Sequence, residues 1–341
     1  MKINQRFIAM AAVIMASVLL PFSAVAQDSK PVIRLGQYPG TVGNMHAQIA
    51  VEKGFCDTYG IKCQLVTVTS GPMALQTLLG KSMEVGMFVP EVAFGGIAKG
   101  ADIQVVMGGY GSQPYALVVR NDISLPKGEG NSMAALKGLK GLKIGVPSRG
   151  SGAELHLVEL LNLAGLKPTD VTIVAVGAPN TGYPALVVGK TIDAMINFPP
   201  LADMCNVGKT CTTVLDLSRG EGPPAIREMI GASVPMWMRR DYIEANPKVL
   251  DALQRAMLDT EKWMKDPANF DEVVAIYSKH IPLTGIANAQ QILRSWLKSD
   301  MLQISVRLNR VALKAIHDYA LRNKLITEPI DLNRVVWAKA L

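Results

Sequence analysis

Residues 142–152 read LKIGVPSRGSG, and this stretch decides the fold. Its first five residues are mostly apolar and predict a buried strand, and residues 147–152 form a glycine-rich loop. A helix is predicted over residues 153–165, and a second strand over residues 171–176. A strand, a glycine-rich loop, a helix and another strand in this order predict a βαβ unit with parallel strands.

The same order of elements occurs once more, nearer the start of the chain. A strand is predicted over residues 32–36, and a glycine-rich loop, a helix, a second strand and a turn follow at residues 39–43, 45–54, 64–68 and 69–72. The two closing segments, LLGKSMEVGMF at 78–88 and VVGKTIDAMINF at 187–198, match nearly position for position. This internal repeat predicts an α/β protein with two similar lobes.

Two further strands are predicted to carry the chain between the lobes. The first covers residues 115–119, and the return lies near residues 232–237. Amphipathic helical runs follow at residues 250–264, 289–297 and 311–321, and we expect them to pack back on the first lobe. The predicted organisation is a discontinuous lobe 1 of residues 27–117 and 233–341, a lobe 2 of residues 118–232, and a hinge of two crossovers.

The first 26 residues have the pattern of a cleavable signal peptide. Lys2 and Arg6 form a positive segment, residues 7–20 are almost wholly apolar, and Ala24-Val25-Ala26 has the small-x-small pattern of a cleavage site. Residue 27 is Gln and not Cys, so no lipid anchor is expected. We therefore expect a mature protein that stays in the periplasm.

The formal net charge of the whole chain is +7 at pH 7, and the excess is spread along the sequence. No block of like charges is present, so nucleic acid is not expected as a partner. A modest positive balance fits an anionic ligand without requiring one.

The four cysteines lie in two close pairs. In an oxidising compartment, this arrangement predicts the local disulfides Cys56–Cys63 and Cys205–Cys211. The alternative is a metal site, but neither pair has the C-x2-4-C spacing with further Cys or His that zinc requires. No metal site is expected.

Several short motifs point to one family. They are IAVEKGF at 49–55, SGP at 70–72, LKGLKGLKIGV at 136–146, GSG at 150–152, AGL at 164–166, DVT at 170–172 and IDA at 192–194. With them the chain resembles the substrate-binding proteins of the nitrate, sulfonate, taurine and bicarbonate importers, a group that includes relatives of thiamine-pyrimidine-binding proteins. Members often carry an aromatic residue in place of Cys56 and an apolar one in place of Cys63, so the disulfide prediction is specific to this chain.

The resemblance implies a type II-like periplasmic binding protein with two α/β lobes. Such a protein captures a small molecule in the cleft between its lobes by hinge closure, and the permease of an ABC importer in the inner membrane recognises the closed form. For this chain it implies a monomer that binds a small organic anion, a sulfonate or carboxylate, with an aromatic body as one option. Alternatives left open are a neutral pyrimidine-like ring as the ligand, a periplasmic enzyme of similar fold, and a subunit that presents its ligand to a signalling receptor.

Ligands of doubly wound α/β lobes bind beyond the carboxyl ends of the strands, where helices begin. The loop at 148–152 is the best candidate for an anion, since its glycines allow close approach and Ser151 adds a hydroxyl. An ordinary strand–helix turn with a Ser cap is the alternative. Arg149 either clamps a carboxylate or sulfonate in bidentate fashion or points to solvent.

Aromatic residues near the predicted strand ends would suit an organic body, although core packing is the alternative for each of them. Glu91, just past the third strand, could meet an amine or a ring N–H group. The full set of expected ligand-binding residues is Tyr38, Thr41, Val42, Gly43, Ser70, Gly71, Phe88, Val89, Glu91, Tyr115, Arg149, Gly150, Ser151, Gly152, Asn180, Tyr183, Asn197 and Phe198.

None of the short motifs in the sequence meets the requirements of a catalytic motif. The GKS and GKT triplets at 80–82 and 189–191 lack the earlier glycine of a phosphate-binding loop, and they precede a strand instead of opening a helix. The four histidines are scattered without metal-ligand spacing. We therefore expect no catalytic residues and no cofactor.

Overall fold

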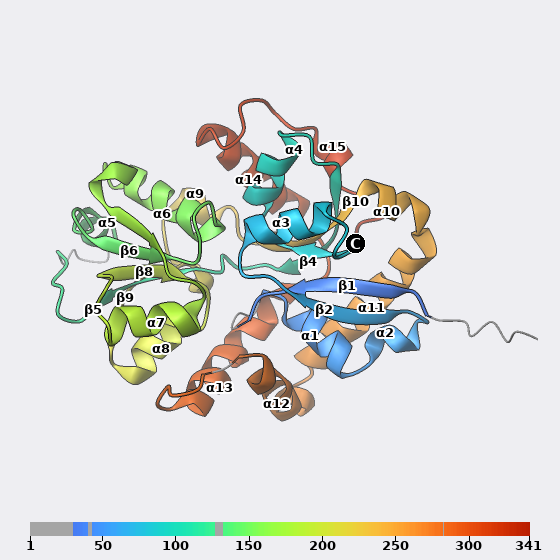
Figure 1. The fold of residues 1–341 in the computed structure, drawn as a ribbon, viewed down its shortest axis with the longest axis horizontal. Coiled ribbons are helices and arrows are strands. Elements are labelled where there is room, and N and C mark those ends of the chain that lie inside the picture. The colour runs from blue at the N-terminus through green and yellow to red at the C-terminus, as the bar shows by residue number, and fades with distance from the viewer. Residues whose placement is uncertain (1–29, 40–42, 127–131, 282) are drawn as a thin grey trace, which may run out of the picture. The chain divides into compact units, whose positions relative to one another are not determined.

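The internal repeat folds as two copies of one order of elements (Figure 1). The first copy consists of β1 Val32–Gln37, α1 Met45–Glu52, α2 Phe55–Thr58, β2 Lys62–Thr67, α3 Gly71–Leu79, β3 Gly86–Met87 and α4 Pro90–Ile97. The second consists of β6 Lys143–Val146, α6 Gly152–Leu163, β7 Thr172–Ala175, α7 Pro179–Val187, β8 Ala194–Asn197 and α8 Leu201–Gly208. Alternating strand and helix patterns in the sequence therefore predicted these elements to within a few residues.

The computed structural model describes residues 30–39, 43–126, 132–281 and 283–341. Residues from Pro31 to Leu341 form one compact unit. The predicted signal peptide, residues 1–26, lies outside the described residues. In the described part, no helix has the length and apolar character needed to cross a membrane.

A five-stranded sheet with the order β7-β6-β8-β5-β9 contains the second copy of the repeat. The strands β7, β6 and β8 run parallel, as predicted, but β5 Ala116–Arg120 is antiparallel to both β8 and β9 Cys211–Asp216. The sheet is thus mixed, because β5 enters from a crossover and not from a βαβ unit. Helices α5 Ser132–Lys137 and α6 lie on one face, and α7 and α8 on the other (Figure 1).

The first copy is divided between two sheets. The strands β1 and β2 pair in parallel, and a parallel bridge between Leu35 and Val85 joins β1 to the residue before β3. This arrangement gives the order β2-β1-β3, which corresponds to β7-β6-β8 in the second copy. The strand β3 belongs to an antiparallel sheet with the order β11-β4-β10-β3, built from β4 Ile103–Tyr110, β10 Val234–Arg239 and β11 Ile304–Ser305.

Some of the C-terminal helices pack on helices of the first copy, and others contact different elements. The C-terminal helices are α10 Arg240–Ala245, α11 Pro247–Lys265, α12 Phe270–His280, α13 Ala289–Asp300, α14 Arg310–Arg322 and α15 Leu332–Val335, and the short α9 Pro224–Arg227 precedes β10. Helix α11 contacts α1 and α2, α12 contacts α1, and α14 contacts α4. Helix α13 contacts α8 of the second copy, so the contact surface of the C-terminal helices extends beyond the first copy.

The two GK-containing triplets occupy equivalent turns. Lys81 and Lys190 both adopt a left-handed backbone conformation, with φ of 59° and 48°. Each turn ends a helix, α3 or α7, and leads into the next strand. A phosphate-binding loop begins a helix, whereas each of these triplets follows one. The triplets therefore do not form phosphate-binding loops.

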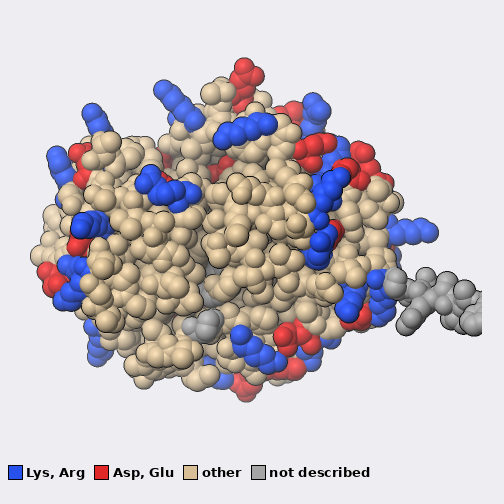
Figure 2. Space-filling view, viewed as in Figure 1, with Lys and Arg blue, Asp and Glu red and all other residues tan. Residues whose placement is uncertain are grey.

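The predicted disulfides Cys56–Cys63 and Cys205–Cys211 are both present, and no cysteine is free. The first links α2 to β2, and the second links α8 to β9. Each closes a short loop. The Cα–Cα distance is 5.8 Å for Cys56–Cys63 and 4.7 Å for Cys205–Cys211. Charged side chains of both signs are scattered over the face shown in Figure 2, as the sequence indicated.

Candidate functional site

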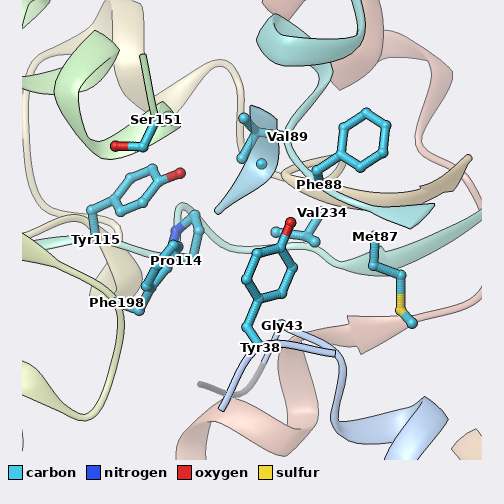
Figure 3. Close-up of a pocket in the computed structure, with 12 residues that line it drawn as sticks. Tyr38, Gly43, Met87, Phe88, Val89, Pro114, Tyr115, Ser151, Phe198 and Val234 are labelled. Atoms are coloured by element: carbon cyan, nitrogen blue, oxygen red, sulfur yellow. The ribbon is translucent and has the colours of Figure 1, made fainter. Parts of the chain in front are cut away.

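A small cavity lies where the carboxyl ends of β1 and β3 and the N-termini of α3, α4 and α6 come together (Figure 3). Its lining residues are Tyr38, Gly43, Gly71, Met87, Phe88, Val89, Pro114, Tyr115, Ser151, Gly152, Phe198 and Val234. Strand–helix junctions from both copies of the repeat contribute to this wall. This is the position where doubly wound α/β folds bind their ligands.

The cavity has a volume of about 20 Å³. A void needs roughly 10–15 Å³ to hold one water molecule, so this space accommodates little more than that. An organic ligand therefore requires the wall residues to separate before it can enter.

Aromatic rings from both copies face each other across the cavity. The ring centroid of Phe198 lies 6.1 Å from that of Tyr38 and 5.5 Å from that of Tyr115. Phe88 stacks on Trp237 with centroids 6.0 Å apart, and the indole Nε1 of Trp237 donates to the carbonyl oxygen of Phe88 at 2.9 Å. Such walls suit flat or apolar ligand bodies.

The two lining tyrosines supply neutral hydroxyls. Burial raises the pKa of Tyr38 and the pKa of Tyr115 above their ordinary range, because the phenolate would lose its hydration. Both hydroxyls therefore stay protonated and can donate or accept a hydrogen bond at physiological pH.

Ser151 lines the cavity and begins α6. Its side-chain oxygen accepts from the backbone N–H of Glu154, which makes it the N-cap of the helix. The carboxylate of Glu154 in turn accepts from the backbone N–H of Gly150 at 2.6 Å. The chain thus places an anion of its own at the outer side of the predicted anion-binding loop.

Arg149 lies away from the cavity. Its guanidinium pairs with the Glu154 carboxylate at 2.8 Å and its side chain is 65% exposed. The structure therefore puts Arg149 at the solvent-facing side of the loop, and the alternative in which it clamps a ligand has no support in this arrangement.

Glu91 is buried behind the wall, with 3% of its surface exposed, and does not line the cavity. Burial raises the pKa of its carboxyl to about 7. Ser70 caps α3 by accepting from the backbone N–H of Met73, and its neighbour Gly71 reaches the cavity. Gly150 supports the loop without lining the cavity.

Two other expected ligand residues, Tyr183 and Asn197, make hydrogen bonds within the five-stranded half instead. The Tyr183 hydroxyl is hydrogen-bonded to Thr210, and the Asn197 side-chain amide donates to the carbonyl oxygen of Gly177 at 2.9 Å. The side-chain oxygen of Asn180 is buried with no hydrogen-bond partner among the described residues, and Asn180 does not line the cavity. Thr41 and Val42 lie outside the described residues.

Met87, Pro114 and Val234 line the cavity and were not expected there. Met87 directly precedes the expected Phe88, so its place at the end of a predicted strand was a usable signal. Pro114 and Val234 lie at the starts of the two predicted crossing strands, where apolar residues normally indicate packing.

The two chain crossings between β4 and β5 and between β9 and β10 meet beside the cavity. The carbonyl oxygen of Gly111 accepts from the backbone N–H of Gly231 at 2.6 Å, and the Ser112 hydroxyl donates to the carbonyl oxygen of Ser218 at 2.6 Å. These bonds tie the two crossings to each other.

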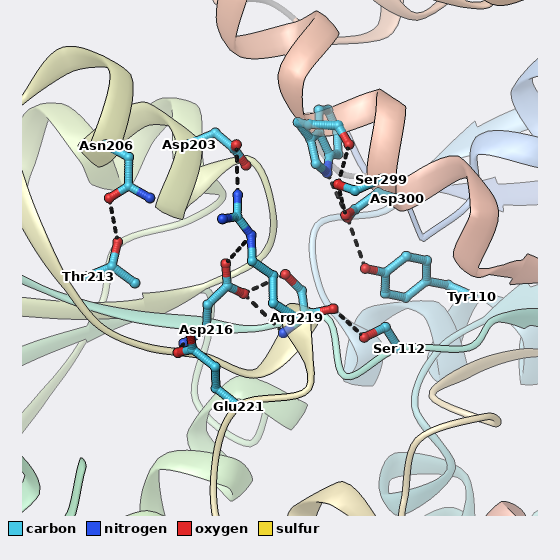
Figure 4. Close-up of polar contacts among 12 residues, drawn as sticks. Tyr110, Ser112, Asp203, Asn206, Thr213, Asp216, Arg219, Glu221, Ser299 and Asp300 are labelled. Atoms are coloured by element: carbon cyan, nitrogen blue, oxygen red, sulfur yellow. Dashed lines mark hydrogen bonds and ion pairs between the residues drawn. The ribbon is translucent and has the colours of Figure 1, made fainter. Parts of the chain in front are cut away.

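Buried carboxylates lie near this meeting point in two groups (Figure 4). Arg219 lies 3.2 Å from both Asp203 and Asp216. Asp300 at the end of α13 accepts from the Tyr110 hydroxyl at 2.9 Å and from the Trp296 indole N–H at 2.7 Å. Among the described residues, no group of three or more His, Cys, Asp or Glu side chains is arranged to hold a metal ion.

The chain belongs to the NMT1-like family, whose family model matches residues 26–278. A protein of Brucella abortus (strain 2308), whose name ascribes to it a binding role, is 31% identical over 201 residues. The match covers 58% of this chain and 56% of that relative, so it spans about half the length of the relative.

Solved structures show the same fold. A protein of Bordetella bronchiseptica RB50 aligns with a TM-score of 0.73 and 22% identity, over 91% of this chain and 95% of that one. The periplasmic aliphatic sulphonate binding protein of Escherichia coli aligns with a TM-score of 0.67 and 18% identity, over 91% and 98%. The α/β architecture is therefore that of periplasmic binding proteins, as the sequence motifs predicted.

Proposed function

We propose that the chain is a periplasmic solute-binding protein of an ABC importer, and that it holds a small organic anion in the cavity described above. The observation that carries the proposal is the cavity itself, where aromatic rings from both copies of the repeat surround the first turn of α6. Membership of the NMT1-like family and the binding role ascribed to the Brucella relative support it.

The ligand in this proposal has an apolar or aromatic body and a sulfonate or carboxylate head. Tyr38, Tyr115 and Phe198 contact the body, and the Ser151 hydroxyl with the backbone N–H of Gly152 meets the head. A helix N-terminus stabilises an anion by ~0.3–1 kcal/mol, and by up to ~2 kcal/mol when partly buried. The Escherichia coli structural neighbour is named as an aliphatic sulphonate binding protein, which is consistent with such a head group.

One specific observation favours a second candidate, a neutral ring. The twelve described residues that line the cavity include no Lys, Arg, Asp or Glu. A neutral pyrimidine-like ring would stack between the aromatic walls and bond to the tyrosine hydroxyls without a counter-charge. The choice between the two ligand classes is an outcome of the experiment below.

Capture in this proposal proceeds by closure about two crossovers. We place lobe 1 at residues 27–117 and 233–341, and lobe 2 at residues 118–232. A ligand that contacts both walls favours the closed form only by its difference in affinity between the two forms. In this proposal the protein acts as a monomer that presents the closed form to an inner-membrane permease, and it is not an enzyme.

Thermal unfolding of the mature protein against sulfonates, carboxylates, nitrate, bicarbonate and pyrimidines tests the proposal. A ligand at about 100 times its dissociation constant stabilises the folded state by ~2.7 kcal/mol. We expect a rise in Tm with an organic sulfonate or carboxylate, and a weaker rise with the same compound in Ser151→Ala.

Phe198→Ala and Phe270→Ala form a matched pair for locating the site. Both rings are half-buried, but only Phe198 lines the cavity. Loss of the ligand-induced shift in Phe198→Ala alone supports this cavity as the site. Equal loss in both variants, or a shift only with neutral rings, would overturn the anion proposal.

A further inference from the structure

Two buried ionisable side chains meet directly behind the cavity wall. Glu91 lies in the first turn of α4 and His156 in the first turns of α6, and their exposed fractions are 3% and 0%. The Glu91 Oε1 atom lies 3.9 Å from His156 Nε2. Since α4 follows β3 and α6 follows β6, this contact joins the two copies of the repeat.

The hydrogen bonds of His156 fix where its proton lies. Its Nδ1 atom is 2.8 Å from the carbonyl oxygen of Gly152, and a carbonyl oxygen can only accept, so Nδ1 carries a hydrogen. Burial lowers the pKa of His156 to about 4, so the ring is neutral and Nε2 presents a lone pair. Within the part of the chain that the structure describes, the Nε2 atom has no other hydrogen-bond partner.

A lone pair on Nε2 facing an ionised carboxylate would leave two acceptors opposed in a dry environment. A protonated Glu91 carboxyl resolves this conflict, because its O–H can donate to Nε2 after a small approach. The raised pKa of Glu91, about 7, agrees with a carboxyl that keeps its proton. The pair then carries no net charge.

The other titratable groups that face the pair are phenols. The His156 ring centroid lies 4.9 Å from Tyr115 and 6.1 Å from Tyr319 of α14. Burial raises the pKa of both phenols, so they stay neutral. Helix α3 and strand β8, which also pack here, carry no titratable side chain. Farther along the packed elements lie Lys137, Glu159, Asp170, His317 and Arg322.

We infer that Glu91 and His156 share one proton as a unit, and that this proton fastens the first turn of α6 to α4. Ser151 and Gly152, which line the cavity, belong to the fastened turn. The role of the pair in positioning a ligand rests on the proposed function, whereas the shared proton does not. Glu91 and His156 are thus positioning residues.

A shared proton has a distinctive effect on stability. In the unfolded chain Glu titrates near ~4.3 and His near ~6.5, so these two groups together hold one proton between those pH values. The folded pair also holds one proton in this range. Since stability depends on pH only where the two states bind different numbers of protons, the wild-type pair adds no slope between about pH 4.5 and 6.5.

Each single variant uncovers a slope of opposite sign. In Glu91→Gln the folded His156 stays neutral while the unfolded one takes up a proton, so stability falls as the pH drops from about 6.5 to 4.5. In His156→Gln the folded Glu91 stays protonated while the unfolded one ionises, so stability falls as the pH rises through the same range. The unfolding constant should change by up to about tenfold per pH unit relative to wild type.

Denaturant unfolding between pH 4.5 and 6.5 of wild type, both single variants and the double variant tests the inference. We expect opposite slopes for the single variants and a wild-type slope for the double variant. Tyr319→Phe is the control, because it removes the bond from the Tyr319 hydroxyl to the Leu155 carbonyl oxygen without removing a group that titrates in this range. It should lower stability at all pH values equally.

Nitrogen NMR of the wild-type histidine rings gives a second measurement that needs no variant to fold. At pH 5.5 we expect a neutral His156 ring with its hydrogen on Nδ1. A charged ring at that pH, or single variants with slopes of the same sign, would overturn the inference. No ligand enters either measurement, so failure here is distinct from failure of the proposed binding function.

Discussion

Gly152 lines the cavity and is also the first residue of helix α6. A Cβ atom there would lie 2.2 Å from the Tyr115 hydroxyl oxygen and 2.8 Å from a methyl group of Val89. Both neighbours are buried, so neither side chain can move away freely. We expect Gly152→Ala to reduce the free energy of unfolding by about 1–3 kcal/mol, as measured by denaturant unfolding.

A double variant separates the two contacts of that Cβ atom. Tyr115→Phe removes the hydroxyl oxygen, so Gly152→Ala in this background should cost less than it does in wild type. Part of the loss should remain, because the contact with Val89 persists. Additive effects of the two substitutions would contradict this account.

The sequence predicted most of the cavity residues, because glycine-rich loops after strands carry a clear signal. It could not show that Arg149 turns to Glu154, since which of two neighbouring groups a flexible cation meets depends on the folded positions of both. Tyr183 shows the same limit. Its ring was expected at the cavity and instead packs within the five-stranded half. The place of a residue in a predicted helix does not show which structure its side chain will pack against.

At the scale of elements, β4 approaches its neighbour β10 very closely at Gly109. A Cβ atom on Gly109 would lie 2.1 Å from the carbonyl oxygen of Val234, which belongs to the neighbouring β10. The backbone of β10 cannot move away from this Cβ atom without breaking the pairing of β4 with β10. Gly109→Ala should therefore cost about 3 kcal/mol or more in denaturant unfolding.

Gly95 provides the matched control for that substitution. It lies within α4, and a Cβ atom there has no neighbour within 4 Å. Gly95→Ala should leave stability unchanged or raise it by up to about 1 kcal/mol through helix propensity. A similar loss in both variants would mean that the close approach at β4 is not the cause.

The elements of the repeat were readable because hydrophobic periodicity and glycine loops are local signals. The antiparallel entry of β5 and β10 into their sheets was not readable in the same way. Strand direction within a sheet depends on which edge the crossing chain reaches, and residues distant in sequence decide that. The disulfides were predictable because each pair lies close in sequence.

At the scale of the whole molecule, Asp300 connects the C-terminal helices to the chain crossings. Burial raises the pKa of Asp300 to about 7, and the nearby Asp203 and Asp216 carboxylates add to this effect. In the unfolded chain the Asp300 carboxyl ionises near ~3.9. The stabilisation that its raised folded-state pKa provides is therefore complete below that pH and is lost as the pH rises through about 7. We expect Asp300→Asn to remove this downward slope between about pH 4 and 7.

Denaturant unfolding across that pH range measures the effect. Asp251→Asn is the control, because Asp251 is an exposed carboxylate paired with Arg255 on α11. It should leave the slope as in wild type. An unchanged slope in Asp300→Asn would show that the carboxyl at the end of α13 is not the group responsible.

The size of the space between the aromatic rings limits how fast a ligand can bind at the proposed site. A space of about 20 Å³ has room for little more than one water molecule, so under the proposed function a ligand must wait until the rings part. At low concentration the rate of uptake then rises with the number of collisions. If the proposed ligand binds in this cavity, its rate of uptake at high concentration should level off at the rate at which the rings part.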